Sequence, residues 1–203
     1  MRIAILVEGK TEQAFKPYLQ NFLKKRLSGN MPKLDMVPSD GGLKTNDKLQ
    51  RMVKMLLNDK QHPADAVIAL TDVYPDYTTA DDAKTKMKKW VGEEEHFYVH
   101  VALHDFEAWL LPYWEKIKSL AGSNRKAPAN NPETVNHSKS PAYWLAEVYR
   151  TGSKKKSYVK ARDVGSILKG EDLMVSINAC TELKSFINRI LSLCGIEEKD
   201  LIP

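Results

Sequence analysis

The sequence is poor in the features that mark secreted, membrane-spanning and disulfide-rich proteins. It has only two cysteines in 203 residues, without metal-ligand spacing, so we expect Cys180 and Cys194 to be buried free thiols. No apolar run approaches the roughly 18 residues that cross a bilayer. Met1 leads into an apolar strand pattern rather than a signal peptide. We therefore expect a cytoplasmic protein with no membrane association.

What the chain does contain is an ordinary globular composition with a moderate positive charge. Hydrophobic residues make up 42% and charged residues 28%, and the formal net charge is +5. The length fits one domain, or one domain with a helical extension. This charge permits a polyanionic partner without requiring one. Two basic clusters stand out, and each is either a solvated face or a phosphate-binding surface. The first consists of Lys84, Lys86, Lys88 and Lys89, and the second of Arg150, Lys154, Lys155, Lys156, Lys160 and Arg162.

The opening stretch is the strongest local signal. Residues 2–7 are almost wholly apolar and run directly into Glu8, Gly9 and a second acid, Glu12. Such a run is typical of a buried strand in a parallel sheet, where ligands bind outside the carboxyl ends of the strands. Glu8 is therefore either a site residue or a solvated strand end. A phosphate-binding P-loop is excluded, because Ala4 stands where that motif needs its first glycine.

The same design occurs twice more along the chain. A strand predicted at 66–71 ends on Asp72, and a strand at 97–103 runs into the block His104–Glu107, which we expect to open another helix. Right-handed crossovers bring the carboxyl ends of parallel strands to one edge of a sheet. We therefore expect the acids at these three strand ends to share one crevice.

Periodicity and turn signals predict the remaining elements: helices at 11–27, 46–59 and 79–91, a weak strand at 33–38, a polar linker at 123–139, and helices that begin at Pro141 and Thr181. Thr11 is the expected cap of the first helix, and Pro17 is a point where that helix kinks or restarts. The fold class is α/β, with a roughly four-stranded, mainly parallel sheet flanked by helices over 1–121. A helical C-terminal region follows over 122–203.

A group of carboxylates in one crevice has a characteristic chemistry. The expected group is Glu8, Asp72 and Glu107, with Glu12, Asp76 and Asp105 as neighbours. These carboxylates repel one another unless their pKa values rise or a hard cation neutralises them. Oxygen ligands without cysteine favour Mg²⁺ or Mn²⁺. A cation with open coordination positions binds phosphate and activates water. We therefore expect the strand-end carboxylates to converge on a metal site that hydrolyses phosphodiester bonds.

Several residues keep two interpretations. His104 is either a structural residue at a strand end or a phosphate contact, and Lys160 and Arg162 are either solvated charges or site residues. Four tryptophans are expected in the core rather than as base-stacking surfaces, because they lie at helical spacing among aliphatic residues: Trp90, Trp109, Trp114 and Trp144.

Three blocks resemble a known fold. The turn at 7–12, Asp72 after its strand, and the block at 104–108 resemble the Toprim fold of topoisomerases, primases and OLD-type nucleases. They are more similar still to a family of small, uncharacterised Toprim-like proteins, often encoded beside an ATPase. That family's C-terminal pattern also matches 158–163 and the helix after Cys180. The resemblance thus covers nearly the whole chain, although each motif is short.

The resemblance implies roles for individual positions. Glu8, Asp72, Glu107 and Lys160 are the expected catalytic residues, with Glu8, Asp72, Asp76 and Glu107 as metal ligands. Tyr74 stands where the Toprim pattern has the second aspartate of its DxD element. The nearest acid is Asp76, so whether one or two cations bind stays open. Nucleic acid is expected to contact Lys10, His104, Lys154, Lys155, Lys156 and Arg162.

The expectation from residues and resemblance together is a Mg²⁺- or Mn²⁺-dependent nuclease. An ATPase partner and a role in phage defence or repair are implied by the resemblance alone. The alternative is a non-catalytic subunit of an ATPase complex that binds nucleic acid or a partner, which Tyr74 keeps open. DNA or RNA as substrate, cleavage at ends or at internal sites, and monomer or homodimer are undecided at this stage.

Overall fold

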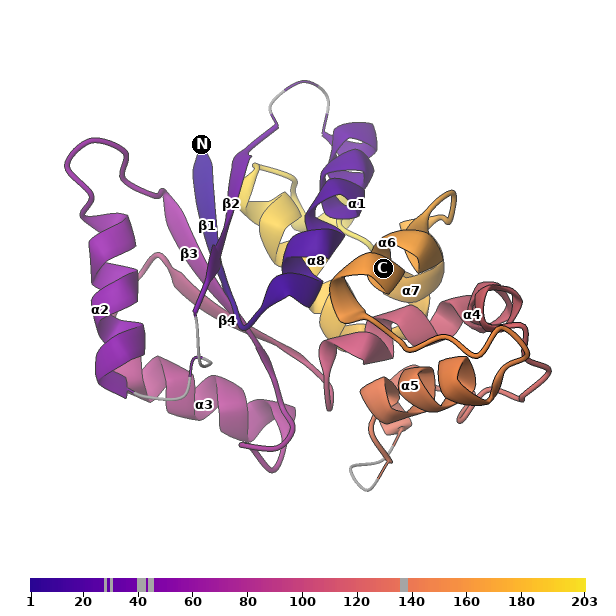
Figure 1. Cartoon of the computed structure of the whole chain (residues 1–203). Helices are drawn as coiled ribbons and strands as arrows, with labels where there is room; N and C mark the ends of the chain where they lie inside the picture. Colours follow the sequence, from indigo (N-terminus) through magenta and orange to yellow (C-terminus); the bar gives the residue numbers. More distant parts are fainter. Residues whose placement is uncertain (28, 30, 40–42, 44–45, 136–138) are drawn as a thin grey trace.

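A parallel sheet forms the centre of the molecule (Figure 1). The computed structural model covers residues 1–203 and describes all except 28, 30, 40–42, 44–45 and 136–138. Its four strands are β1 (Arg2–Val7), β2 (Lys33–Pro38), β3 (Ala66–Asp72) and β4 (Phe97–Ala102). They pair in the order β2-β1-β3-β4, each neighbouring pair parallel.

Helices occupy most of the remaining chain: α1 (Lys10–Arg26), α2 (Asn46–Leu57), α3 (Ala80–Val91), α4 (Trp114–Ala121), α5 (Pro141–Thr151), α6 (Lys160–Leu168), α7 (Leu173–Ala179) and α8 (Thr181–Leu193), with 3-10 helices η1 (Phe106–Tyr113), η2 (Pro132–Thr134) and η4 (Glu198–Asp200). The predicted α/β fold, a parallel sheet flanked by helices with a helical C-terminal region, is confirmed.

The strand order places a switch point between β1 and β3. From β1 the chain crosses through α1 to β2 on one side, and it then returns through α2 to β3 on the other side. Reversing the direction across a sheet also moves the connecting helix to the opposite face. The carboxyl ends of β1 and β3 therefore flank a crevice of the kind that binds ligands in open α/β sheets.

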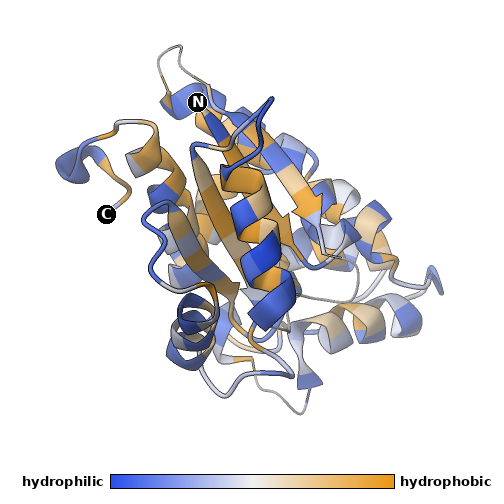
Figure 2. Ribbon diagram, turned by 90° about the vertical axis from the view of Figure 1, so that its left-hand side faces the viewer, coloured by the Kyte–Doolittle hydropathy of each residue, from blue (hydrophilic) through white to orange (hydrophobic). Residues whose placement is uncertain are grey.

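Two hydrophobic cores cover the two faces of the sheet. One lies between the sheet and α2 and α3, with Leu49, Val53 and Met87 against alternate strand residues. The other lies between the sheet and α1, η1 and the C-terminal helices, around Phe15, Trp109 and neighbouring residues. The strands are correspondingly apolar in Figure 2, and the outer surfaces of the helices are hydrophilic. This double burial explains the apolar runs of the strand sequences.

The helical C-terminal region packs on the same core as α1. The Tyr18 hydroxyl donates to the Gly165 carbonyl at 2.8 Å, and the buried Ser176 hydroxyl donates to the Trp109 carbonyl at 2.6 Å. The boundary predicted at residue 122 therefore lies between two parts of the chain that share a core. Among the helices of the described residues, none combines the length and apolar character that spanning a bilayer requires.

Some local expectations differ from the structure. Gly9, rather than Thr11, is the N-cap of α1, and this helix runs through Pro17 without a break in its assignment. The chain after Asp105 forms the 3-10 helix η1, and α4 begins only at Trp114. The eight residues of η1 are predominantly aromatic and aliphatic. They include Pro112, which has no backbone N–H to donate to an α-helical hydrogen bond, so a continuous α-helix from Asp105 is disfavoured. Both cysteines are free, but Cys194 is only partly buried.

His100 gives the fold a predictable pH dependence. It is 5% exposed and meets Phe186 edge to face, with ring centroids 5.8 Å apart. Burial, aided by the positive charges of Arg189, Lys84 and Lys88, lowers the pKa of His100 to about 3. The unfolded chain binds this proton near pH 6.5. The contribution of His100 to stability is therefore complete above about pH 6.5 and is lost as the pH falls below it.

We expect the free energy of unfolding to drop by about 2 kcal/mol between pH 6.5 and pH 5 on account of His100. The variant His100→Leu replaces the imidazole with an apolar side chain that binds no proton, so it should lose that part of the pH dependence. Urea unfolding of both proteins at the two pH values measures the difference. Equal losses in both proteins would show that His100 does not carry the effect.

Candidate active site

Glu8 lies at the switch point and is fixed by the neighbouring strand. It follows β1 directly, and its Oε1 atom accepts hydrogen bonds from the Thr71 hydroxyl and from the Asp72 backbone N–H, the latter at 3.1 Å. The register accounts for these bonds, because Leu6 of β1 pairs with Ala69 of β3. Glu8 therefore stands beside Thr71, at the end of β3.

Asp72 is the last residue of β3 and the most crowded acid of the site. Burial raises the pKa of Asp72 well above its ordinary value, and the charges of four carboxylates raise it further. These four, together with Asp72, form what we call the carboxylate cluster: Glu8, Glu12, Asp72, Asp105 and Glu107. The acids expected at three strand ends are therefore near enough to raise the pKa of Asp72, and their role as one site stays a prediction.

Glu12 enters the carboxylate cluster from the first turn of α1. It is 5% exposed, and burial raises its pKa, with further contributions from Glu8 and Glu107. Its own backbone N–H and the Lys160 ammonium work in the opposite direction. The free N–H groups of a helix N-terminus favour a negative charge. The helix thus offsets part of the cost of placing this carboxylate here.

Asp105 connects the carboxylate cluster to α5. Its Oδ2 atom accepts a hydrogen bond from the Ala142 backbone N–H at 3.1 Å, and the Ser140 side chain also bonds to it. Burial and the Glu107 charge together raise the pKa of Asp105 to about 6. Its other oxygen, Oδ1, is buried without a hydrogen-bond partner among the described residues. Asp105 thus ties α5 to the carboxyl edge of the sheet.

Glu107 is fully buried and is paired with a cation from a distant part of the chain. Its Oε1 atom lies 3.2 Å from the Lys160 ammonium and accepts a hydrogen bond from the Tyr158 hydroxyl at 3.3 Å. Burial opposes the charge of Lys160, but Glu107, Asp72 and Asp105 raise the pKa of Lys160 above its ordinary value. Lys160 is therefore the cation paired with the carboxylate cluster, and its catalytic role stays a prediction.

Tyr158 is a site residue that sequence reasoning did not identify. Burial raises its pKa strongly, and the Glu107 charge adds to the shift. Its hydroxyl therefore stays protonated and serves as a donor to Glu107. The available signal was its position two residues before Lys160, in the stretch that resembles the family pattern.

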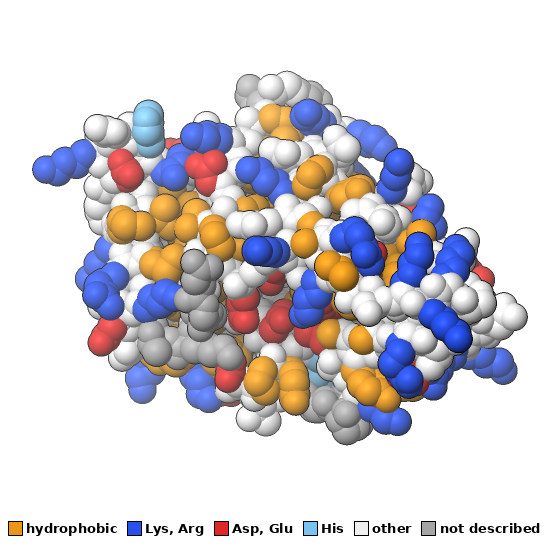
Figure 3. Space-filling model, viewed as in Figure 1, with side chains coloured by type: hydrophobic (Ala, Val, Ile, Leu, Met, Phe, Trp, Pro, Cys, Tyr) orange, Lys and Arg blue, Asp and Glu red, His pale blue; other side chains and the backbone are white. Residues whose placement is uncertain are grey.

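Basic side chains surround the acids on the face shown in Figure 3. Acidic side chains gather near its centre, and Lys and Arg side chains cover much of the side formed by the C-terminal helices. Lys154, Lys155 and Lys156 are exposed. Lys156 and Arg162 line a cavity of about 390 Å³ together with the buried Tyr149. Arg162 is also held by Asp163, with Nε 2.8 Å from Oδ1.

The other predicted site residues lie in mixed positions. Lys10 is exposed at the start of α1, close in sequence to Glu8. His104 is 7% exposed, and its backbone has a left-handed φ of 69° while its carbonyl accepts from the Tyr74 N–H at 2.8 Å. Asp76 is exposed and lines a different cavity, beside Lys86 and other residues of α3.

The fit of a divalent cation can be judged from the donors. The carboxylate cluster offers only hard oxygen ligands, and Glu107 Oε2 and Asp105 Oδ1 are buried without partners in the described part of the chain. However, no three His, Cys, Asp or Glu side chains among the described residues lie close enough together to hold a metal ion. Thr71 and Lys160 instead contact Glu8 and Glu107, and the convergence of these acids on a cation stays a prediction. The donor chemistry suits Mg²⁺ or Mn²⁺, but binding requires these side chains to approach one another.

Crowding of the carboxylates predicts that Asp72 lowers stability. Because its folded-state pKa lies above the unfolded value of about 3.9, its stabilising contribution is complete below that pH and is lost as the pH rises. Asp72→Asn should therefore raise the free energy of unfolding at pH 8 by about 1 kcal/mol, which corresponds to a rise of a few degrees in the melting temperature. The exposed Asp81 of α3 provides a matched control, Asp81→Asn. A melting temperature that is unchanged or lower in Asp72→Asn contradicts the crowding.

The fold and site define a parallel α/β protein with a carboxylate cluster at the carboxyl edge of its sheet. Over residues 7–191 the sequence matches the family described as "Domain of unknown function (DUF4276)", and the chain belongs to this family. The expectation of an uncharacterised family is thereby confirmed, while the relation to Toprim enzymes stays a prediction.

Two further comparisons add little. No curated protein matches the sequence. Among solved structures, a similar chain is the "C-terminal region of the Xanthomonas campestris pv. campestris OLD protein". It is 16% identical with a TM-score of 0.44, and the match covers 94% of this chain and 98% of that chain. Similarity at this level carries no argument about function.

Proposed function

We propose that this protein hydrolyses phosphodiester bonds of nucleic acid with the help of Mg²⁺ or Mn²⁺, in the manner of a Toprim-type nuclease. One observation carries the proposal. Asp72, at the switch point of the sheet, has its pKa raised by burial and by four neighbouring carboxylates. Carboxylates with strongly raised pKa values at the ligand-binding edge of an α/β sheet are typical of catalytic sites, which supports the proposal.

The carboxylates have distinct proposed roles. Glu8, which accepts a hydrogen bond from the Asp72 backbone N–H, and Asp72 itself would hold the cation, with Glu107 as the third ligand. A bound divalent cation supplies positive charge to a phosphate and lowers the pKa of a bound water. Glu12 and Asp105 set the local charge, and the hydrogen bonds of Asp105 to α5 fix the wall of the site. Asp76 stays a candidate for a second cation.

Lys160 is proposed to exchange partners when substrate binds. In the free protein its ammonium neutralises Glu107 at 3.2 Å. With a cation beside Glu107, the Lys160 ammonium would be free to donate a hydrogen bond to a substrate phosphate. Lys10, Lys154, Lys155, Lys156 and Arg162 would hold the flanking backbone phosphates, with His104 as a further contact.

A specific observation also favours a second function, a non-catalytic nucleic-acid-binding subunit. The Lys160–Glu107 ion pair already neutralises one acid of the cluster, and the described residues hold no ready-made set of three metal ligands. In this case the carboxylate cluster would be structural or would bind a basic partner. An ATPase partner and a role in phage defence or repair are compatible with both functions and are part of the proposal.

The two functions are separated by a cleavage assay. Single- and double-stranded DNA and RNA oligonucleotides are incubated with the protein in Mg²⁺, in Mn²⁺ and in chelator, with and without an ATPase encoded beside it. The nuclease predicts strand breaks that require metal. Salt-sensitive binding without breaks in any arm would leave the binding subunit and overturn the nuclease.

A further inference from the structure

Two aromatic side chains of α5 reach the surface. Tyr143 is 43% exposed, and Trp144, expected in the core, is only partly buried and packs against the edge of the core. Their rings meet edge to face, with centroids 5.8 Å apart. Trp109 and Trp114, by contrast, are 1% and 6% exposed. The two α5 rings therefore present aromatic surface to an incoming molecule.

Two cations flank these rings. The Lys139 ammonium lies 5.8 Å from the centroid of Tyr143 and 5.9 Å from that of Trp144. The Arg125 guanidinium lies 5.4 Å from the centroid of Trp144. These distances are within the range of cation–π attraction, about 6 Å. We call Arg125, Lys139, Tyr143 and Trp144 the α5 platform.

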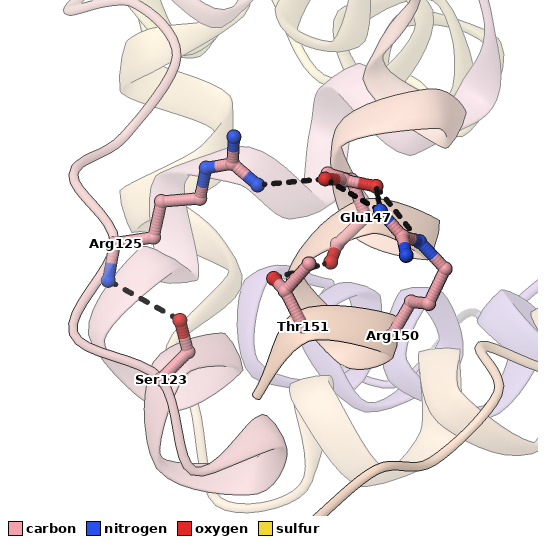
Figure 4. A network of polar contacts seen from close by, with 5 residues as sticks. All are labelled: Ser123, Arg125, Glu147, Arg150 and Thr151. Atoms are coloured by element: carbon pink, nitrogen blue, oxygen red, sulfur yellow. Dashed lines mark hydrogen bonds and ion pairs between the residues drawn. The ribbon is translucent and has the colours of Figure 1, made fainter. Parts of the chain in front are cut away.

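The Arg125 side chain is fixed before any ligand arrives (Figure 4). Glu147 Oε1 accepts from Arg125 at 3.1 Å, and the same carboxylate binds Arg150 at 2.8 Å. The Arg125 carbonyl accepts from the buried Trp114 indole at 2.8 Å, and its N–H donates to the Ser123 hydroxyl at 3.2 Å. A side chain held in this way loses little conformational entropy on binding.

The α5 platform adjoins the carboxylate cluster. Ala142, the residue before Tyr143, donates its backbone N–H to Asp105 of that cluster at 3.1 Å. The N–H of Tyr143 itself is directed to the Ser140 hydroxyl at 3.4 Å, at the cap of the same helix. The exposed aromatic residues therefore begin one residue away from a contact with the acids.

We propose that the α5 platform binds unpaired bases of single-stranded nucleic acid beside the carboxylate cluster, an inference that rests on the proposed function and names its substrate class. Stacked bases need an accessible aromatic face, and the adjoining phosphates need cations; the platform offers both. Bases of a duplex are already stacked on one another and cannot use it without unpairing. A single strand, or a strand splayed from a duplex, is the matching ligand.

The test measures binding in chelator, so it does not depend on cleavage. Labelled oligothymidylate, oligouridylate and a duplex, each of about twenty nucleotides, are titrated with the wild-type chain. Tyr143→Leu and Trp144→Leu are each expected to weaken single-strand binding about tenfold and to leave duplex binding unchanged. Tyr143→Phe, which keeps the ring, should stay within about twofold of wild type. Oligothymidylate and oligouridylate distinguish DNA from RNA.

Abasic substitution checks that the lost contact is a base. An oligothymidylate with several abasic positions keeps all its phosphates but lacks bases to stack. Wild type should bind it about tenfold more weakly than the intact strand, whereas the leucine variants should bind the two strands with similar affinity. Equal weakening of single strand and duplex by the leucine substitutions, or no weakening, would overturn the proposal. So would a wild-type chain that binds no single strand.

Two controls complete the design. Thermal unfolding confirms that each variant is folded; if Trp144→Leu is not, Tyr143→Leu and Tyr143→Phe carry the test alone. Base-dependent binding without metal-dependent strand breaks would support the α5 platform and contradict the nuclease. Metal-dependent strand breaks without base-dependent binding would support the nuclease and contradict the α5 platform. The failure of either proposal is therefore visible separately.

Discussion

Replacing Glu8 with glutamine is expected to reduce metal-dependent cleavage by at least about 10³-fold, the loss of several kcal/mol of transition-state stabilisation. The amide keeps the size of the side chain and can still accept from the Thr71 hydroxyl and the Asp72 N–H. It removes the negative charge that would hold the cation. Binding of nucleic acid in chelator should be equal or tighter, because a charge that repels phosphate is gone.

The matched control is Glu95→Gln. Glu95 is exposed and precedes β4, at the opposite edge of the sheet from Glu8. The same change of charge there should leave cleavage within about twofold, since exposed charges more than about 10 Å apart are largely screened in physiological salt. If Glu8→Gln and Glu95→Gln cleave alike, Glu8 is not part of the catalytic site.

Replacing Gly152 with alanine is expected to destabilise the protein by about 3 kcal/mol, lowering the melting temperature by roughly 10 °C. The reason is a close approach of two helix ends. A Cβ atom at Gly152 would lie 2.2 Å from the Ala121 carbonyl oxygen and 3.0 Å from that of Val148. Both are backbone atoms, and hydrogen bonds from Ser153 and Lys154 to Gly122 and Ala121 prevent the chain from moving aside.

Gly165→Ala gives the matched comparison for Gly152→Ala. Gly165 lies within α6, and a Cβ atom there would lie 3.7 Å from its nearest neighbour, the Tyr18 hydroxyl oxygen. Alanine in a helix interior is more favourable than glycine by about 1 kcal/mol. Differential scanning calorimetry should therefore show opposite shifts for the two variants. Similar shifts would contradict the close approach at Gly152.

The sheet and its acidic edge were predictable because their signals are local. Each central strand reads as an uninterrupted apolar run, which follows from burial on both faces, and the acids Glu8 and Asp72 directly follow or end such runs. Parallel connections then place those ends at one edge. The first and last residues of β2, Lys33 and Pro38, were also predicted, although the apolar signal of this strand is weaker.

The remaining parts of the site depend on contacts that no local pattern reveals. Lys160 and Tyr158 meet Glu107 across more than fifty residues of chain, and the sequence supplied only a resemblance for that stretch. Trp144 lies at helical spacing among aliphatic residues, like the buried Trp114, yet its ring is flanked by Arg125 at the protein surface. Periodicity defines the face of a helix, but which face another element covers is decided by tertiary packing.

The central claim is that the carboxylate cluster binds a divalent cation, and a Mn²⁺ titration followed by electron paramagnetic resonance tests it most directly. The signal of free Mn²⁺ reports the bound fraction without substrate, partner or turnover. Wild type should bind Mn²⁺, Mg²⁺ should compete for it, and Asp72→Asn should weaken binding by at least about tenfold, whereas Asp81→Asn should not. Equal Mn²⁺ binding by wild type and Asp72→Asn, or none by wild type, would contradict the account.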